Sequence, residues 1–270
     1  MIKMIALDLD NTLLTSDKTI SKVNENELKK LHQAGIKVVL CTGRPINAIW
    51  KFIEQLGLDD EDDYTITFNG GLVVHNRDKA ELSRIGMSKK QLEPLFTYAK
   101  EKGYPLDILD FKQVYPMSEL NPSIYHQMLA AKMDFIPTKF NDLSDKLYSK
   151  AIMATTPKIL DEVVANMPKS ISENYHIVRS QDRILEFLPA NSDKAAGLEK
   201  LLHHFGWDFS NLMAFGDAEN DAGMLEHAKV GVAMENAIPA IKKIANAETL
   251  SNDQDGVAVF LKNYFKTLNS

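Results

Sequence analysis

Two aspartates stand two positions apart at the end of a short apolar run near the start of the chain. The run is Met4–Leu9, and the acids are Asp8 and Asp10. Short continuous apolar runs are typical of strands buried in a parallel sheet, and side chains two positions apart on a strand point the same way. Because ligands bind at the carboxyl ends of such strands, both carboxylates can approach one substrate atom. A turn or helix cap explains one acid here, and less easily two.

A second acidic group follows another apolar run, Asn211–Phe215. It is Gly216–Asp221, with acids at Asp217 and Asp221. The alternative is a turn and a helix N-terminus, where Asn and Asp are common caps. Carboxylates gathered without basic partners repel one another and shift one another's pKa. A divalent cation offsets that repulsion, and hard oxygen ligands with open positions suit Mg²⁺.

Two further segments have the residue types that hold an anion. In Thr42–Pro45, the glycine admits an anion close to its amide and the Thr42 hydroxyl can donate to phosphate. The proline suits the first turn of a helix, whose N-terminal N–H groups are free; an ordinary strand-to-helix turn is the alternative. Lys194 stands in the first turn of a predicted helix, Asp193–Phe205, where its charge opposes the helix dipole. A neighbouring anion would compensate, whereas a solvated surface lysine is the alternative.

The elements that must position these residues alternate between strand and helix at both ends of the chain. That alternation predicts an α/β fold with a parallel sheet covered by helices. From about Ser83 to Leu188 the strands are shorter and more polar and mix irregularly with helices such as Ser88–Lys102. We therefore expect a core domain of residues 1–82 and 189–270 and an inserted α+β domain of residues 83–188.

The composition is that of an ordinary globular protein: 270 residues, 44% hydrophobic and 25% charged. A net charge of −6 argues against a generic nucleic-acid surface and also looks unsuited to an anionic substrate. The single cysteine, Cys41, excludes a disulfide framework and a Cys-rich zinc site, and we expect it to be a small core residue. No apolar run approaches the roughly 18 residues of a membrane helix. We expect a cytoplasmic protein with no membrane or nucleic-acid partner.

In chain order, the paired acids, Thr42, Lys194 and Gly216–Asp221 resemble the motifs of the haloacid dehalogenase-like (HAD) hydrolase superfamily. Thr67–Leu72 and other segments are similar to its Cof-type subgroup with a class IIB cap, and within it to broad-specificity sugar-phosphate phosphatases. The resemblance spans essentially the whole chain and implies a Rossmann-like parallel-sheet core with the insert as a cap. Asn11 stands where this subgroup usually has Gly; because Asn tolerates left-handed backbone, we expect little consequence.

The resemblance further implies a Mg²⁺-dependent phosphatase acting on a small phosphorylated metabolite, foremost a sugar phosphate, through an aspartyl-phosphate. It implies that Asp8 is the nucleophile and that Asp10 is the general acid and then the base. It implies Mg²⁺ ligands from Asp8, the backbone carbonyl of Asp10, and Asp217, with Asp221 supporting them. The groups that it implies for holding the phosphoryl oxygens are the Leu9 amide, Thr42, the Gly43 amide, Lys194 and Asn220.

Two residues have alternative roles at this stage. Arg44 is a candidate substrate contact and could equally pair with acids of the core domain. Asn69 matches a subgroup motif as a candidate substrate contact, and the alternative is that it only shapes a hairpin. Two other functions stay open as well: a phosphomutase of the same superfamily and a phosphoaspartate signalling module. Asp10 argues against the second, because it can activate the water that hydrolyses a phosphoaspartate.

Overall fold

The computed structural model describes residues 1–128, 133–190 and 192–267. The chain divides into two compact units, of which one comprises Met1–Arg84 and Asp193–Ser270 and the other Ile85–Ser192. These divisions lie a few residues C-terminal to the boundaries expected from the sequence, after residues 82 and 188. Among the described residues, no helix has both the length and the apolar character that crossing a bilayer requires.

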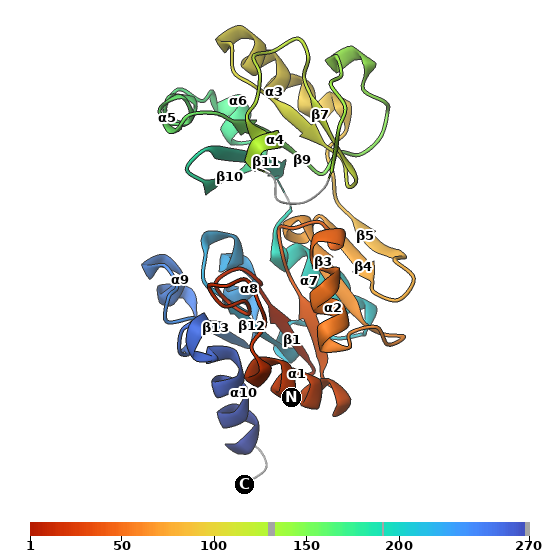
Figure 1. Ribbon diagram of the computed structural model, residues 1–270, viewed down its shortest axis with the longest axis vertical. Helices are drawn as coiled ribbons and strands as arrows, with labels where there is room; N and C mark the ends of the chain where they lie inside the picture. Colours follow the sequence, from red (N-terminus) through yellow and green to blue (C-terminus); the bar gives the residue numbers. More distant parts are fainter. Residues whose placement is uncertain (129–132, 191, 268–270) are drawn as a thin grey trace. The chain divides into compact units, whose positions relative to one another are not determined.

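The first unit is built on a parallel sheet whose described strands lie in the order β14-β13-β12-β1-β2 (Figure 1). They span Met4–Leu7 (β1), Lys37–Leu40 (β2), Leu212–Gly216 (β12), Val230–Ala233 (β13) and Ala247–Glu248 (β14). All of β1 is buried, which explains its continuous apolar sequence. Leu7 lies beside Leu40 and Phe215 in register, so three strands end at the same edge. The predicted α/β fold with a parallel sheet is confirmed.

Two groups of helices pack in this unit. The helices span Lys22–Gln33 (α1), Trp50–Leu56 (α2), Lys194–His204 (α7), Ala222–His227 (α8), Pro239–Ile244 (α9) and Gly256–Thr267 (α10). Helix α1 contacts α2 and α10, whereas α8 contacts α7 and α9. Helix α1 begins where the Ser21 side chain accepts a hydrogen bond from the Asn24 amide, and it buries Leu28 and Leu31.

An antiparallel sheet adjoins the end of β2. Its strands are Tyr64–Thr67 (β3), Leu72–His75 (β4) and Glu81–Arg84 (β5). Cys41 pairs with Ile66 in a parallel bridge, and the Thr42 amide donates to the Ile66 carbonyl at 2.9 Å. A 3-10 turn, Phe68–Gly70, connects β3 to β4. This turn therefore lies beside the residues that follow β2.

The second unit contains a mixed sheet whose described strands lie in the order β10-β11-β9-β6-β7-β8. The strands span Asp107–Leu109 (β6), Gln113–Pro116 (β7), Asp134–Phe135 (β8), Lys150–Ala154 (β9), Tyr175–Gln181 (β10) and Ile184–Pro189 (β11). The helices span Lys89–Lys102 (α3), Tyr125–Met128 (α4), Pro157–Ala165 (α5) and Lys169–Ser172 (α6). The α3 prediction is confirmed, including a capping box between Ser88 and Gln91.

The sequence predicted that a helix starts directly at Thr42–Pro45, and this prediction is wrong. Pro45 precedes a short 3-10 turn, Ile46–Ala48, and α2 begins only at Trp50. Between them Ile49 is fully buried and has φ −120° and ψ 0°, outside the helical region, so its backbone interrupts the two helical segments. The amides that follow Thr42 therefore belong to an irregular loop and do not form an α-helix N-terminus.

Candidate active site

Residues after three strands meet at the carboxyl edge of the parallel sheet. Asp8 follows β1, Thr42 follows β2 after one residue, and Asp217 follows β12. Asp8, Asp217 and Asp221 each offer a carboxylate oxygen, and these oxygens lie within 4.8 Å of one another. The structure therefore brings together the two acidic groups that the sequence separates by about two hundred positions.

Lys194 is the cation of this acidic group. It is the first residue of α7, whose N-cap Asp193 accepts a hydrogen bond from the Ala196 amide at 2.7 Å. Its side chain is 0% exposed, and Nζ donates to Asp8 Oδ1 and to Asp221 Oδ1, the latter at 2.7 Å. Burial disfavours the charge, but the two carboxylates outweigh burial and raise the pKa of Lys194. Of the two alternatives for this lysine, the structure therefore shows the neighbouring anions and not a solvated surface position.

Both carboxylate oxygens of Asp221 accept hydrogen bonds from residues of the site. Oδ1 accepts from Lys194, whereas Oδ2 accepts from the amides of Asp217 and Ala218 at 2.9 and 3.0 Å. A Cβ on Gly216 would stand 2.5 Å from the Asp221 Cβ, so only glycine fits there. Asp221 therefore holds Lys194 and the loop that carries Asp217.

Asp8 and Asp217 belong to a buried cluster in which three carboxylates, with that of Asp221, face the cation Lys194. Burial, with added repulsion from Asp221 and Asp217, raises the pKa of Asp8 to about 8 although Lys194 opposes the shift. Burial and Asp221 raise the pKa of Asp217 to about 6, opposed by a hydrogen bond from Thr12 Oγ1 at 2.8 Å. Carboxylate oxygens within 4.8 Å of one another, with one lysine as their cation, are ligands that suit a hard divalent cation such as Mg²⁺.

Asp10 is held by two basic side chains. The Arg44 guanidinium donates two hydrogen bonds to this carboxylate, from Nε to Oδ2 at 2.9 Å and from Nη2 to Oδ1 at 2.5 Å. Lys18 Nζ adds a contact to Oδ1 at 3.1 Å. Burial disfavours the carboxylate charge, but hydrogen bonds from Arg44 and Lys18 outweigh it and lower the pKa of Asp10. Of the two roles open to Arg44, this structure shows the pairing with a core acid.

The remaining predicted anion-holding groups lie around the turn between β3 and β4. Thr42 Oγ1 accepts from the Arg44 amide at 3.1 Å, and the Asn69 amide donates to the Thr42 carbonyl at 3.0 Å. Asn220 Nδ2 donates to Asn69 Oδ1 at 3.2 Å. Leu9, between the paired acids, has a buried side chain. Thr42, Asn69 and Asn220 are thus neighbours linked through hydrogen bonds.

Sequence reasoning missed two residues of this site. Thr12 stands two positions after Asp10, so the spacing Asp8, Asp10, Thr12 carried a signal for its contact with Asp217. Lys18 contacts Asp10 from a turn in which the φ of Lys18 is +58°, and no local sequence pattern predicts that contact. Cys41 is 0% exposed, and burial raises the pKa of its thiol to about 12, which fits the predicted role of an inert core residue.

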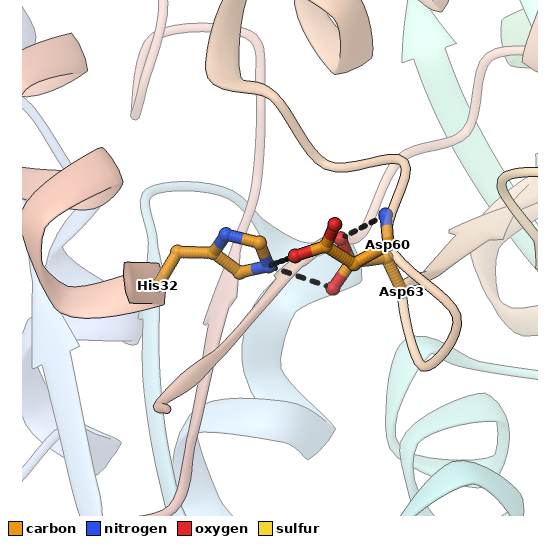
Figure 2. A group of neighbouring side chains, drawn as sticks. All are labelled: His32, Asp60 and Asp63. Carbon is orange, nitrogen blue, oxygen red and sulfur yellow. Dashed lines mark hydrogen bonds and ion pairs between the residues drawn. The ribbon is translucent and has the colours of Figure 1, made fainter. Parts of the chain in front are cut away.

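Another group of possible ligands lies away from this edge. His32, near the end of α1, points its Nε2 at Asp63, 2.9 Å away, and toward Asp60 (Figure 2). Asp63 Oδ2 also accepts from the Asp60 amide at 3.0 Å. These residues stand where the chain enters β2 and β3, at the amino ends of those strands. Their contacts tie α1 to the loop before β3.

This parallel sheet, with paired acids, a buried lysine and an acidic loop at its carboxyl edge, has the fold and the residue types of the haloacid dehalogenase-like hydrolases. The model of the haloacid dehalogenase-like hydrolases matches residues 5–261, and this chain belongs to that family.

Relatives and solved structures match the chain over nearly its full length. YxeH of Bacillus subtilis, assigned as a phosphatase, is 31% identical over 260 residues, with 96% of each chain covered. YitU of the same organism, a 5-amino-6-(5-phospho-D-ribitylamino)uracil phosphatase, is 31% identical over 287 residues, with 97% of each covered. A haloacid dehalogenase-like hydrolase structure from Bacteroides thetaiotaomicron has 28% identity and a TM-score of 0.83, covering 98% and 100% of the two chains. The chain has the enzyme class of these relatives, a phosphatase.

Proposed function

We propose that this protein is a Mg²⁺-dependent phosphatase that hydrolyses small phosphomonoesters, foremost sugar phosphates, through an aspartyl-phosphate on Asp8. One observation carries the proposal: the Asp8 carboxylate lies at the carboxyl edge of the sheet, bonded to the buried Lys194, among acids short of positive charge. The relative YitU acts on a compound whose name places the phosphate on a ribityl chain. That substrate supports a small polyol phosphate as the chemical class.

In the first step, an Asp8 oxygen forms a bond to phosphorus while the bond to the leaving alcohol oxygen breaks. Lys194 offsets the repulsion between the carboxylate and the phosphoryl group, and the Thr42 hydroxyl with the Leu9 and Gly43 amides holds the phosphoryl oxygens. A Mg²⁺ held by Asp8, the Asp10 carbonyl and Asp217 would supply further neutralisation of the phosphoryl charge. In the second step, the oxygen of a water molecule bonds to the same phosphorus while the bond from phosphorus to the Asp8 oxygen breaks, which releases inorganic phosphate and restores the Asp8 carboxylate.

Asp10 serves both steps by moving a proton at its carboxylate. Its ion pairs with Arg44 and Lys18 keep it charged without substrate, and that state suits the base that activates water. The acid that protonates the leaving oxygen needs a proton on Asp10. Substrate binding must therefore weaken at least one contact from Arg44, and a substrate hydroxyl or phosphate that attracts Arg44 would do so.

The inserted unit is proposed as the cap that selects among leaving groups, and the cytoplasm as the site of action. The cap proposal rests on the family membership. The proposed compartment rests on the single cysteine, which is free and buried.

The test is a turnover assay with and without Mg²⁺ over sugar phosphates, nucleotides, pyridoxal phosphate and flavin mononucleotide. We expect steady release of inorganic phosphate, and loss of about 10⁴-fold or more in Asp8→Asn with folding intact, since the nucleophile is removed. Asp59→Asn, an exposed acid outside the site, is the matched control.

Mg²⁺-dependent turnover retained in Asp8→Asn would reject Asp8 as the nucleophile. One equivalent of labelling without turnover would favour the signalling module, and isomerised sugar phosphate without free phosphate would favour the phosphomutase.

A further inference from the structure

The turn between β3 and β4 has an uncommon backbone. Phe68, Asn69 and Gly70 have φ values of +53°, +53° and +93° in succession. Non-glycine residues rarely adopt positive φ, and a bulky residue such as Phe68 does so only where its surroundings impose it. Asn is one of the residues that tolerate this conformation, and Asn69 has ψ +46°, within the left-handed region.

The surroundings that hold this turn are the phosphate-binding segments of the proposed site. The Asn69 amide donates to the Thr42 carbonyl at 3.0 Å. Gly70 packs against the start of α7 so closely that a Cβ there would stand 1.8 Å from the Asp193 carbonyl oxygen. The turn therefore contacts the residues after β2 on one side and Asp193, which precedes Lys194, on the other.

The Asn69 side chain makes two contacts of its own. Its Oδ1 accepts a hydrogen bond from Asn220 Nδ2 at 3.2 Å. The side-chain amide of Asn69 also packs against Gly43. A Cβ on that glycine would lie 3.0 Å from Asn69 Nδ2 and 3.1 Å from Asn69 Oδ1. One half-buried side chain thus touches both the loop after β2 and the loop after β12.

We infer that Asn69 is a positioning residue that fixes the Gly43 amide and the Asn220 side chain as one phosphoryl-binding surface. This inference rests on the proposed function and deepens it. Asn suits the position because it accepts the left-handed backbone and supplies an acceptor for Asn220. Gly would accept the backbone but leave Asn220 unbound and Gly43 uncovered, and a β-branched residue would be strained at φ +53°.

The test uses Asn69→Gly, which keeps the backbone conformation and removes the side chain. Titration calorimetry with inorganic phosphate in the presence of Mg²⁺ is the direct measurement, and kcat and KM are measured beside it. We expect phosphate to bind roughly 3- to 10-fold more weakly, as for the loss of a net hydrogen bond, and kcat/KM to fall by at least as much. Lys79→Gly is the matched control, because Lys79 also has positive φ, at +60°, in an exposed turn outside the site.

A double-mutant cycle separates positioning from a general loss of structure. If Asn69 acts through Asn220, Asn220→Ala will weaken phosphate binding clearly in the wild type and little further in Asn69→Gly. Additive losses would overturn the inference, as would Asn69→Gly binding phosphate like the wild type. In both cases a wild type that hydrolyses phosphomonoesters leaves the proposed function standing. A wild type that neither binds phosphate nor turns over would overturn the proposed function and this inference with it.

Discussion

Thr12 donates a hydrogen bond from Oγ1 to Asp217 Oδ1 at 2.8 Å, across 205 positions of sequence. Thr12 is fully buried, and Asp217 is nearly so. The bond therefore orients one proposed metal-ligating carboxylate from the loop that carries the paired acids. It also opposes the effect of burial on the pKa of Asp217. The two acidic motifs are in this way joined directly, besides their shared link through Lys194.

Thr12→Val keeps the shape of the side chain and removes this donor. We expect Mg²⁺ to bind about 10- to 100-fold more weakly, as for other partners that orient metal ligands. Activity at saturating Mg²⁺ should recover most of the wild-type rate. Titration calorimetry and the Mg²⁺ dependence of turnover measure the change, with Thr15→Val, from the partly exposed end of the same loop, as control. An unchanged Mg²⁺ affinity would show that Asp217 needs no such support.

Asp10→Asn removes the proposed proton carrier while keeping its size. We expect kcat/KM to fall by about 10²- to 10⁴-fold, the usual contribution of general acid–base catalysis. The loss should be smaller for p-nitrophenyl phosphate than for an alkyl phosphate, because a good leaving group needs less protonation. Asp17→Asn, an exposed acid in the following turn, should match the wild type. Equal losses for both substrates would argue that Asp10 is not the acid.

Lys194→Met removes the buried cation and leaves its two carboxylate partners behind. Breaking a buried ion pair from one side costs about 3–5 kcal/mol, because the remaining charge is uncompensated. We expect the free energy of unfolding in urea to fall by that amount, and Mg²⁺ to restore part of it. Lys200→Met, at an exposed position of the same helix, should change stability little. A stable Lys194→Met variant insensitive to Mg²⁺ would contradict the charge balance described for this pocket.

Asp107 in β6 is buried, and within the described residues neither carboxylate oxygen has a hydrogen-bond partner. Burial raises the pKa of Asp107 from 3.8 to about 6, and the proximity of Ser123 and His126 offsets only part of that shift. The folded state therefore binds more protons than the unfolded state between these values. Stability falls as pH rises through this window; the cost, up to about 3 kcal/mol, is complete above about pH 6 and absent below 3.8.

Asp107→Asn removes that charge. We expect it to stabilise the protein by about 1–3 kcal/mol near pH 7.5 and to lose this advantage near pH 4. Urea unfolding at the two pH values measures the difference. Asp134→Asn, an exposed acid on β8 of the same sheet, should show no such pH dependence. A gain of equal size at both pH values would point to packing instead of charge.

Much of the fold and of the site follows from local patterns. Continuous apolar runs predict buried parallel strands, and the carboxyl ends of such strands share an edge, so the acids Asp8 and Asp217 were expected to meet. The place of Thr42 beside them was implied by the family resemblance. The place of Lys194 at a helix start left two possibilities open, a neighbouring anion or a solvated surface lysine, and the structure places Asp8 and Asp221 beside it. The local pattern failed after Pro45, where the non-helical backbone of Ile49 separates a short 3-10 turn from α2.

The choice of partner was decided by the tertiary structure alone. Arg44 could reach substrate or an acid, and its pairing with Asp10 depends on how the loops after β1 and β2 face each other. Asn69 lies between Gly43 and Asn220 because the turn after β3 is pressed against both α7 and the residues after β2. Periodicity and turn chemistry act over a few neighbouring residues, so the sequence by itself determined the strands, the helices and the edge where the acids gather. Hydrogen bonds and ion pairs require atoms about 3 Å apart, and only the packing of distant segments brings them to that distance.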